Sequence, residues 1–307
     1  MQTFDLLTGR RIMHKYLRAI GFSDYTRHKE IQKLLSQVYD KPDNIEVSDL
    51  LDSTFITMEK DFGKDMGIGI FGEYDDDDRF QIEYYYPYFK SSTVSSNINC
   101  SISRRADRYA FSVMCEEYRL GISLIFYLQN TNGYLNCISD HISLKQKMPI
   151  RLSAMSNNGR ILLPIRKTVA DRNQALVMSK KRVHLIESAR NGDESAMESL
   201  TMYDIDQFNQ AAMRIQHEDL YSIVDTCFMP AGMECDQYSI IGDILEMEEI
   251  ENTFTHEKIY HFLLECNDIH FSVIINQKDL FGEPAVGRRF KGDVWLQGYV
   301  DFPEETQ

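Results

Sequence analysis

The last third of the chain contains a 17-residue segment, VGRRFKGDVWLQGYVDF (residues 286–302), in which apolar and polar side chains alternate. The even positions hold the apolar set: Phe290, Val294, Leu296, Val300 and Phe302, with glycine at 292 and 298. Successive side chains of a strand point to opposite faces, so a one-residue slip would expose the whole apolar set. The pattern predicts a long, half-buried strand that bends at its glycines, as the strands of small barrels do.

Residues 218–307 are expected to contain five strands, near 220–229, 237–248, 258–266, 269–275 and 286–302. Turn sequences separate them: Pro230-Ala231-Gly232, Asn252-Thr253, Asn267-Asp268 and Phe281-Gly282-Glu283-Pro284. Five short strands in a segment of this length predict a small five-stranded β-barrel, OB-like or SH3-like. A barrel of this size defines an architecture and no particular chemistry.

The part of the chain before this barrel predicts an antiparallel α+β domain over residues 13–175. Two short helices are expected within residues 13–40, where apolar side chains recur at helical spacing. Alternating residues 80–88 are expected to pair with residues 67–71 in a hairpin. Residues 91–108 are rich in serine and are expected to form a loop.

A second hairpin is expected over residues 109–128, followed by a strand over 160–168. Residues 176–217 then predict a helical connector, in which Asp193 is a good N-cap for the second helix. Apolar residues continue the helical pattern after this cap: Met197, Leu200, Phe208, Ala211 and Ile215. The predicted fold class is therefore α+β, with the order α+β domain, helical connector and barrel.

The excess negative charge is confined to the C-terminal part. Residues 218–307 contain 19 Asp and Glu but 5 Lys and Arg, a net charge of −14 that equals the net charge of the whole chain. Such a surface repels phosphate backbones and anionic lipid, and it attracts basic partners chiefly by raising the association rate. We therefore expect a basic protein partner, with nucleic acid and membrane disfavoured; the alternative is that the acidity serves solubility alone.

No motif in the chain supports a metal ion or a cofactor. Gly67–Gly72 match G-x-G-x-x-G, but aspartates follow at 75–78 where a dinucleotide site needs a helix N-terminus. Those aspartates lack the ligand spacing of a calcium loop. His256 and His261 are five residues apart, whereas H-E-x-x-H places its histidines four apart. The six cysteines form no C-x-x-C pair, and we expect them to be free thiols.

One set of residues in the predicted last strand is a candidate binding surface. It combines three basic side chains with two aromatic ones: Arg288, Arg289, Lys291, Trp295 and Tyr299. OB-folds hold single-stranded nucleic acid with basic and aromatic side chains of this kind. The alternative is structural, with the cations in internal ion pairs and Trp295 and Tyr299 packed against the helical connector. A peptide or protein contact is the third interpretation.

Four segments resemble a family of uncharacterised bacterial proteins, a domain of unknown function. They are MHKYLRAIGFS (13–23), SARNGDESAMESLT (188–201), IVDTCFMPAGMECDQYS (223–239) and KDLFGEPAVGRRFKGDVWLQGYVDF (278–302). The resemblance covers nearly the whole chain from Met13 and leaves residues 1–12 outside, which makes Met13 an alternative start. It implies a cytoplasmic bacterial protein, and it assigns no activity, cofactor or catalytic residue.

Three classes of function stay open. The chain has no apolar run near the roughly 20 residues of a membrane span and no signal-peptide pattern, so a cytoplasmic location is expected. The lack of a catalytic signature and the segregated charge favour a non-catalytic interaction or regulatory module. The alternatives are an enzyme with its site at the domain junction, where pockets often form, and single-stranded nucleic-acid binding through the barrel.

Overall fold

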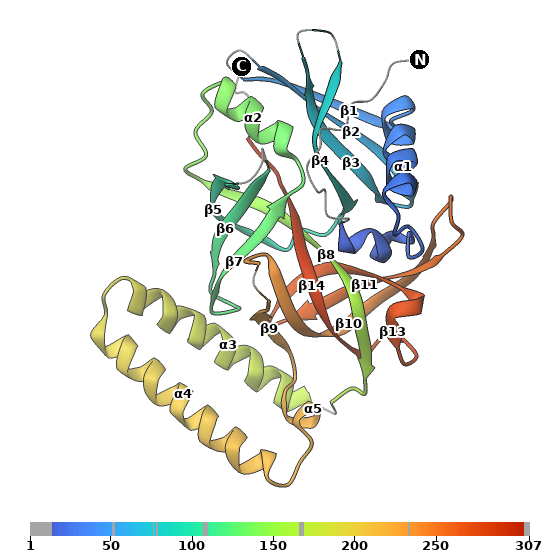
Figure 1. The fold of residues 1–307 in the computed structure, drawn as a ribbon. Coiled ribbons are helices and arrows are strands. Elements are labelled where there is room, and N and C mark those ends of the chain that lie inside the picture. The colour runs from blue at the N-terminus through green and yellow to red at the C-terminus, as the bar shows by residue number, and fades with distance from the viewer. Residues whose placement is uncertain are drawn as a thin grey trace.

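The computed structural model describes residues 14–50, 53–75, 77, 79–106, 110–165, 169–232 and 234–303. Helices and strands are both abundant in these residues, and the predicted α+β class is confirmed. Figure 1 shows two sheets packed together, with a pair of long helices beside the larger one.

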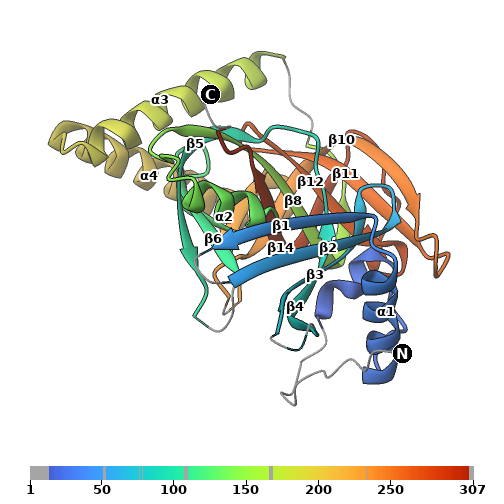
Figure 2. The ribbon, with the colours of Figure 1, turned by 90° about the horizontal axis from the view of Figure 1, so that it is seen from above.

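The smaller sheet comes from the N-terminal part of the chain. It has four antiparallel strands in chain order: β1 (Asn44–Leu50), β2 (Ser53–Gly63), β3 (Met66–Tyr74) and β4 (Phe80–Phe89). The predicted hairpin is confirmed by the pairing of β3 with β4. The 3-10 helix η1 (Lys15–Ile20) and helix α1 (His28–Asp40) precede this sheet, and α1 packs against β2 and β3 (Figure 2).

The larger sheet combines strands from both halves of the chain. The first half contributes β5 (Ser96–Arg104), β6 (Phe111–Glu117), β7 (Ile122–Leu128) and β8 (Lys147–Leu162), with helix α2 (Thr131–Ser139) between β7 and β8. The second half contributes β9 (Cys227–Pro230), β10 (Gln237–Glu251), β11 (Lys258–Cys266), β12 (Ile269–Asn276), β13 (Leu280–Phe281) and β14 (Arg289–Val300). Helix η2 (Gln277–Asp279) joins β12 to β13.

The strand pairings of this sheet form two closed rings. Strand β10 pairs with β14, β14 with β8, β8 with β12, β12 with β11, and β11 with β10. A second closed path runs from β8 through β5, β6, β7 and β14 back to β8. The β8–β14 pair belongs to both rings, and it places a strand from the first half of the chain among those of the acidic C-terminal part.

The register predicted for the last strand is confirmed. Phe290, Val294, Leu296 and Val300 have no exposed surface in the folded chain, and Phe302 is partly buried just after β14. Gly298 is required on the same face, because a Cβ atom there would lie 2.5 Å from the ring of Phe126. The apolar face of β14 therefore has a single possible orientation.

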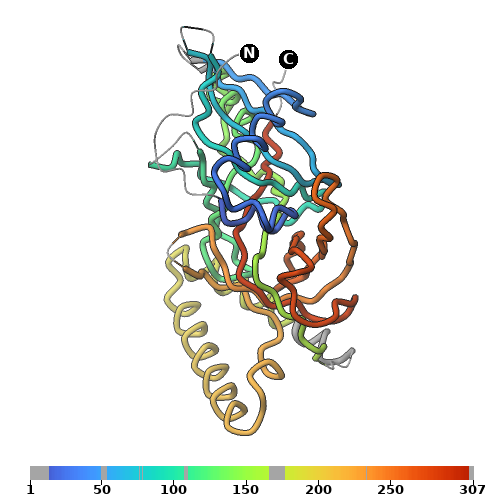
Figure 3. The backbone as a smooth tube through the Cα atoms, turned by 45° about the vertical axis from the view of Figure 1, so that its right-hand side comes forward, coloured from blue at the N-terminus to red at the C-terminus, as the bar shows by residue number. Residues whose placement is uncertain are grey.

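A helical hairpin occupies most of the predicted connector. It consists of α3 (Val169–Arg190) and α4 (Glu194–Ile215), followed by the short helix α5 (Leu220–Ile223). Asp193 caps α4 as predicted, since its side chain accepts hydrogen bonds from the backbone N–H groups of Ser195 and Ala196. Figure 3 shows the hairpin extending away from the smaller sheet, along one side of the strands.

The loop predicted over residues 91–108 is wrong, because strand β5 lies within it. β5 pairs with β6 on one edge and with β8 on the other. Its side chains are half-buried or exposed, so the position tolerates the serine and asparagine residues that indicated a loop. The strand predicted over 160–168 corresponds to the end of β8, and residues 166–168 lie outside the described part of the chain.

The buried apolar side chains form one contiguous cluster that includes residues from both sheets. Asn132 of α2 adds a polar connection between the sheets, because its side chain donates to the carbonyl of Glu46 and accepts from the hydroxyl of Thr57. The division of the chain into three units at residues 175 and 217 stays a prediction.

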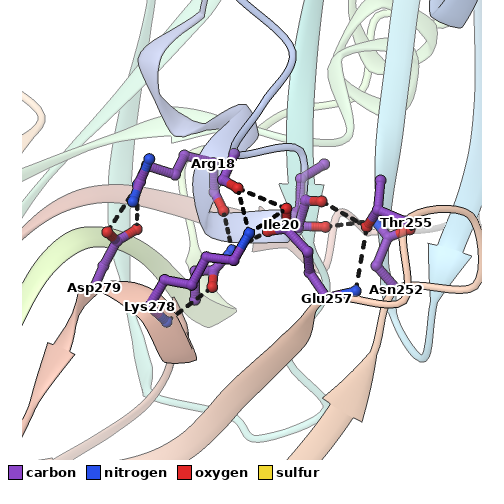
Figure 4. Close-up of polar contacts among 10 residues, drawn as sticks. Arg18, Ile20, Asn252, Thr255, Glu257, Lys278 and Asp279 are labelled. Atoms are coloured by element: carbon purple, nitrogen blue, oxygen red, sulfur yellow. Dashed lines mark hydrogen bonds and ion pairs between the residues drawn. The ribbon is translucent and has the colours of Figure 1, made fainter.

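A polar cluster attaches η1 to the C-terminal strands (Figure 4). Arg18 donates to Asp279 at 2.7 Å, and the side chain of Asn252 donates to the carbonyl of Ile20 at 2.7 Å. Glu257 lies at the centre of the cluster, where it accepts from Ser23 at 2.6 Å and from Lys278 at 2.9 Å. Burial alone would raise the pKa of Glu257, but these hydrogen bonds and one from Asn276 outweigh it and lower the pKa.

The lowered pKa of Glu257 predicts an acid-sensitive contribution to stability. A carboxylate whose pKa is depressed by folding stabilises the chain above the ordinary glutamate pKa of about 4.3, and loses that effect as pH falls further. We expect Glu257→Gln to lower the free energy of unfolding at pH 7 by about 1–3 kcal/mol and to flatten its decline below pH 4.3. Urea titrations at several pH values test this against exposed Glu283→Gln, and parallel pH curves for all three proteins would contradict it.

Burial of the β14 face also predicts the effect of truncating its central residue. Leu296→Ala should lower the free energy of unfolding by about 2–5 kcal/mol, because it leaves a cavity in a closed core. Val286→Ala, at a side chain that is 63% exposed, should change it by less than about 0.5 kcal/mol. Equal urea midpoints for the two variants would show that the even face of β14 is not the core.

Candidate functional site

A cavity of about 280 Å³ lies where η1, β4, β7 and β14 meet the turn before β10. Its lining is mainly aromatic and includes His14, Tyr16, Tyr127 and Trp295, with Asp236 among its charged side chains. Aromatic walls with a few polar groups are typical of small-molecule and side-chain binding sites. The cavity lies at a junction between the two sheets, and residues from both ends of the chain line it.

Trp295 lies at the centre of the cavity wall, on the face of β14 that points away from the core. The even side chains of β14 fill the core, so the odd side chain of Trp295 points to the opposite face. Tyr16 of η1 stacks on it, with ring centroids 5.4 Å apart and an interplanar angle of 22°. The rings of His14 and Tyr127 lie 4.6 Å and 5.3 Å from the same indole. Trp295 is 5% exposed, so the rings and the indole form a nearly closed wall.

Asp236 supplies a buried negative charge beside the indole. Its Oδ2 accepts from Trp295 Nε1 at 3.0 Å and from Arg105 Nη1 at 2.8 Å. Its Oδ1 is buried and has no hydrogen-bond partner among the described residues. The carboxylate side chain is 1% exposed, whereas that of Arg105 is 24% exposed. A buried carboxylate with an unused acceptor atom favours the approach of a further donor or cation.

Three carboxylates act on Tyr16 in the cavity wall. Burial raises the pKa of this phenol, and the carboxylates of Glu234, Asp236 and Asp293 raise it further. Each carboxylate disfavours a phenolate because it would add a second negative charge nearby. Tyr16 is therefore a neutral phenol at physiological pH. The charged side chains of the lining are Lys15, Arg105, Glu234 and Asp236, two basic and two acidic.

The structure separates the five residues predicted as one binding surface. Trp295 lines the cavity, where it packs against Tyr16 and Tyr127; the expected packing against the helical connector is wrong for this residue. Tyr299 lies near Arg151, whose guanidinium is 5.6 Å from its ring. Arg288 donates to the carbonyl of Glu283 at 2.6 Å. Lys291 donates to the hydroxyl of Tyr221 at 2.5 Å. A binding role for these five as one set stays a prediction.

Arg289 is buried and holds the helical hairpin to the strands. Its guanidinium donates to the carbonyl of Leu163 before α3, and to those of Tyr221, Val224 and Asp225 after α4. Burial lowers its pKa, while Asp225 and Asp243 act in the opposite direction. The planar donor fork of arginine suits several carbonyls at once. These backbone contacts close both ends of the hairpin.

A second cavity, of about 350 Å³, lies between the β2–β3 turn and β10 and is lined by several acidic side chains. Its charges are exposed and paired, since Lys64 lies 2.8 Å from Glu248 with side chains 62% and 43% exposed. Within the described residues, no group of three or more His, Cys, Asp and Glu side chains has metal-binding geometry. The expectations of no metal and no cofactor stay predictions.

The sequence matches the model of one protein family over residues 17–298. That family is DUF3881, described as a domain of unknown function from an E. rectale gene description. The chain belongs to this family. The predicted resemblance to a bacterial domain of unknown function is thus confirmed, and DUF3881 carries no assigned activity. No curated protein and no solved structure matches the chain. Among the described residues of this DUF3881 chain, no helix combines the length and apolar content of a membrane span.

The buried guanidinium of Arg289 predicts a strong difference between two adjacent arginines. Arg289→Met should lower the free energy of unfolding by about 2–4 kcal/mol, because four carbonyls lose a charged donor in a buried position. Arg288→Met, which removes one contact at a half-buried position, should cost less than about 1 kcal/mol. Chemical denaturation followed by circular dichroism compares the two, and a similar loss for both would refute the anchoring role of Arg289.

Proposed function

We propose that this chain is a non-catalytic interaction module whose aromatic cavity binds a cationic group of a basic protein partner. The observation that carries the proposal is the buried carboxylate of Asp236 beside Trp295, with one oxygen that no described residue satisfies. Arg105 already pairs with the other oxygen, so a lysine ammonium or an arginine guanidinium would supply a donor to the free oxygen and a second positive charge beside the carboxylate. The aromatic lining then distinguishes such a group from a hydrated metal ion.

Aromatic rings attract cations through the negative potential of their faces, most strongly in tryptophan. In this cavity Lys15 already lies 5.0 Å from the centroid of Tyr16, so this ring accommodates a cation in the folded chain. Glu234, exposed at the cavity, adds negative charge to which a basic partner is attracted on approach. Lys15 and Arg105 balance the two carboxylates of the lining, so the support for a positive ligand comes from the aromatic faces and the free oxygen of Asp236.

The same observations support a non-catalytic role. Asp236 is engaged by Arg105 and Trp295, and Tyr16 in the same cavity is neutral because its pKa is raised. Among the described lining residues there is no serine or cysteine nucleophile. The alternative is an enzyme at this junction, since His14 and two carboxylates line the cavity. Nucleic-acid binding gains little support, because Arg289 is buried and the other basic residues of the set make contacts within the chain.

We place this module in the cytoplasm of a bacterium, in keeping with the six free cysteines. We further propose that the ring of β8, β10, β11, β12 and β14 is a small barrel of OB-like or SH3-like size, to which the acidic residues 218–307 contribute four strands. In this proposal residues 13–175 and 218–307 are the two functional parts, and the helical connector over 176–217 joins them.

Fluorescence provides a direct test, because Trp295 is the single tryptophan of the chain. Titration with n-butylammonium, and with a short lysine-rich peptide, should change its emission saturably. The anion n-butyrate should leave the emission unchanged. Asp236→Asn should weaken the peptide affinity at least tenfold, which corresponds to about 1.4 kcal/mol. Asp140→Asn, at an exposed site after α2, is the matched control and should have little effect.

Two outcomes would overturn the proposal. One is an equal response to butylammonium and butyrate, which would mean that the cavity does not select charge. The other is an unchanged affinity in a folded Asp236→Asn variant, which would place the binding elsewhere. Circular dichroism of each variant separates loss of binding from loss of fold.

A further inference from the structure

Helix α4 carries an apolar stripe that the rest of the chain leaves exposed. The stripe runs along the helix in steps of three or four residues: Met197, Thr201, Ile205, Phe208, Ala212 and Ile215. Its large side chains are 45% to 73% exposed, with Phe208 the most exposed. Side chains at these spacings share one face of a helix. Phe208 and Ile215, which continue the helical pattern in the sequence, lie in solvent in the folded chain.

A different face of α4 holds the hairpin together. Ala196 is the one buried residue described in α4, and Leu200, Tyr203 and Ala211 are half-buried. These four residues also recur at helical spacing, and α4 packs against α3. The hairpin therefore forms without the exposed stripe. An exposed, largely apolar stripe of this length indicates a surface for another macromolecule.

The charges of the hairpin indicate which macromolecule fits. Glu198 and Asp204 border the stripe, and Asp204 is already paired with Arg182 of α3 at 3.4 Å. Helix α4 as a whole has a net charge of −3. Its one basic side chain, Arg214, is already paired with Glu218 at 2.7 Å. The described part of α3, residues 177–190, has a net charge of +3. The apolar stripe thus lies on the acidic helix of the pair. A cationic partner that docked on α3 instead would be repelled by the basic side chains of that helix.

We propose that α4 docks a basic amphipathic helix of another protein against this stripe. The partner helix would place its apolar residues on Ile205 and Phe208, and lysine or arginine beside Glu198. The stripe spans 18 residue steps, about 27 Å of helix, which matches a partner helix of about five turns. Binding of an amphipathic helix through anchors at such spacings is a recurring mode of recognition. This inference rests on α4 alone and does not require the cavity at Trp295.

Two other occupants fit the charges less well. An anionic membrane surface binds helices with lysine and arginine beside the apolar face, whereas α4 has carboxylates there. A second copy of the chain that paired α4 with α4 would bring two helices of net charge −3 together. Like charges at such an interface disfavour association.

The test uses the full chain and a defined probe. The probe is a fluorescein-labelled peptide of 18 residues, with leucine at helical spacing and lysine at the other positions. Its counterpart carries glutamate in place of lysine. We expect the lysine peptide to bind with saturable anisotropy and the glutamate peptide to bind at least tenfold more weakly. Raising the salt concentration should weaken binding of the lysine peptide, since part of the attraction is electrostatic.

Two exposed phenylalanines provide a matched pair of variants. Phe208 and Phe281 are both 73% exposed, and Phe281 lies outside the hairpin in β13. Phe208→Ser should lower the affinity for the lysine peptide at least tenfold, and Phe281→Ser should leave this affinity unchanged. Emission of Trp295 during titration with n-butylammonium should be the same in both variants, which separates this inference from the proposed cavity function.

Three results would overturn the inference. Equal binding of the lysine and glutamate peptides would show that charge plays no part. Equal affinity of the two phenylalanine variants would place the peptide elsewhere. A dimer in light scattering that Phe208→Ser converts to a monomer would show that a second copy covers the stripe.

Discussion

Burial of both faces of β14 is the constraint on which the rest of the structure depends. Its even side chains fill the core, and its odd side chains include buried Arg289, Trp295 and Gln297. The strand also belongs to both closed rings through its pairing with β8. The apolar face therefore stabilises the core. The opposite face contacts the helical hairpin through Arg289 and lines the cavity through Trp295. A change of register would remove the core and both functional features together.

The two faces of β14 differ in how far the sequence predicts them. Alternation alone predicts the apolar face, because the period of a strand is local and independent of its neighbours. The opposite face appears polar in the sequence, and what covers it comes from distant segments: η1 over Trp295, and the ends of the hairpin around Arg289. No local pattern encodes these contacts. The cavity was therefore missed, although Trp295 itself was among the candidate residues.

Other differences have similar physical causes. β5 was missed because serine and asparagine dominate it, yet Ile98, Cys100 and Ile102 alternate and were a signal for a strand. β8 supplies a strand to each ring although it lies far from the acidic part in sequence. The helices of the hairpin were predicted from spacing and capping, which are local. Spacing could not show whether the apolar stripe of α4 is covered, because burial depends on the other elements.

The central claim is that the cavity beside Trp295 and Asp236 selects a positive group. The single indole N–H of the chain donates to Asp236, so its proton resonance reports directly on this carboxylate. The decisive measurement is an NMR titration of that one resonance with n-butylammonium and, separately, with n-butyrate. The account predicts a saturable shift with the cation and none with the anion. An unmoved indole signal with the cation, or an equal shift with both ions, would contradict it.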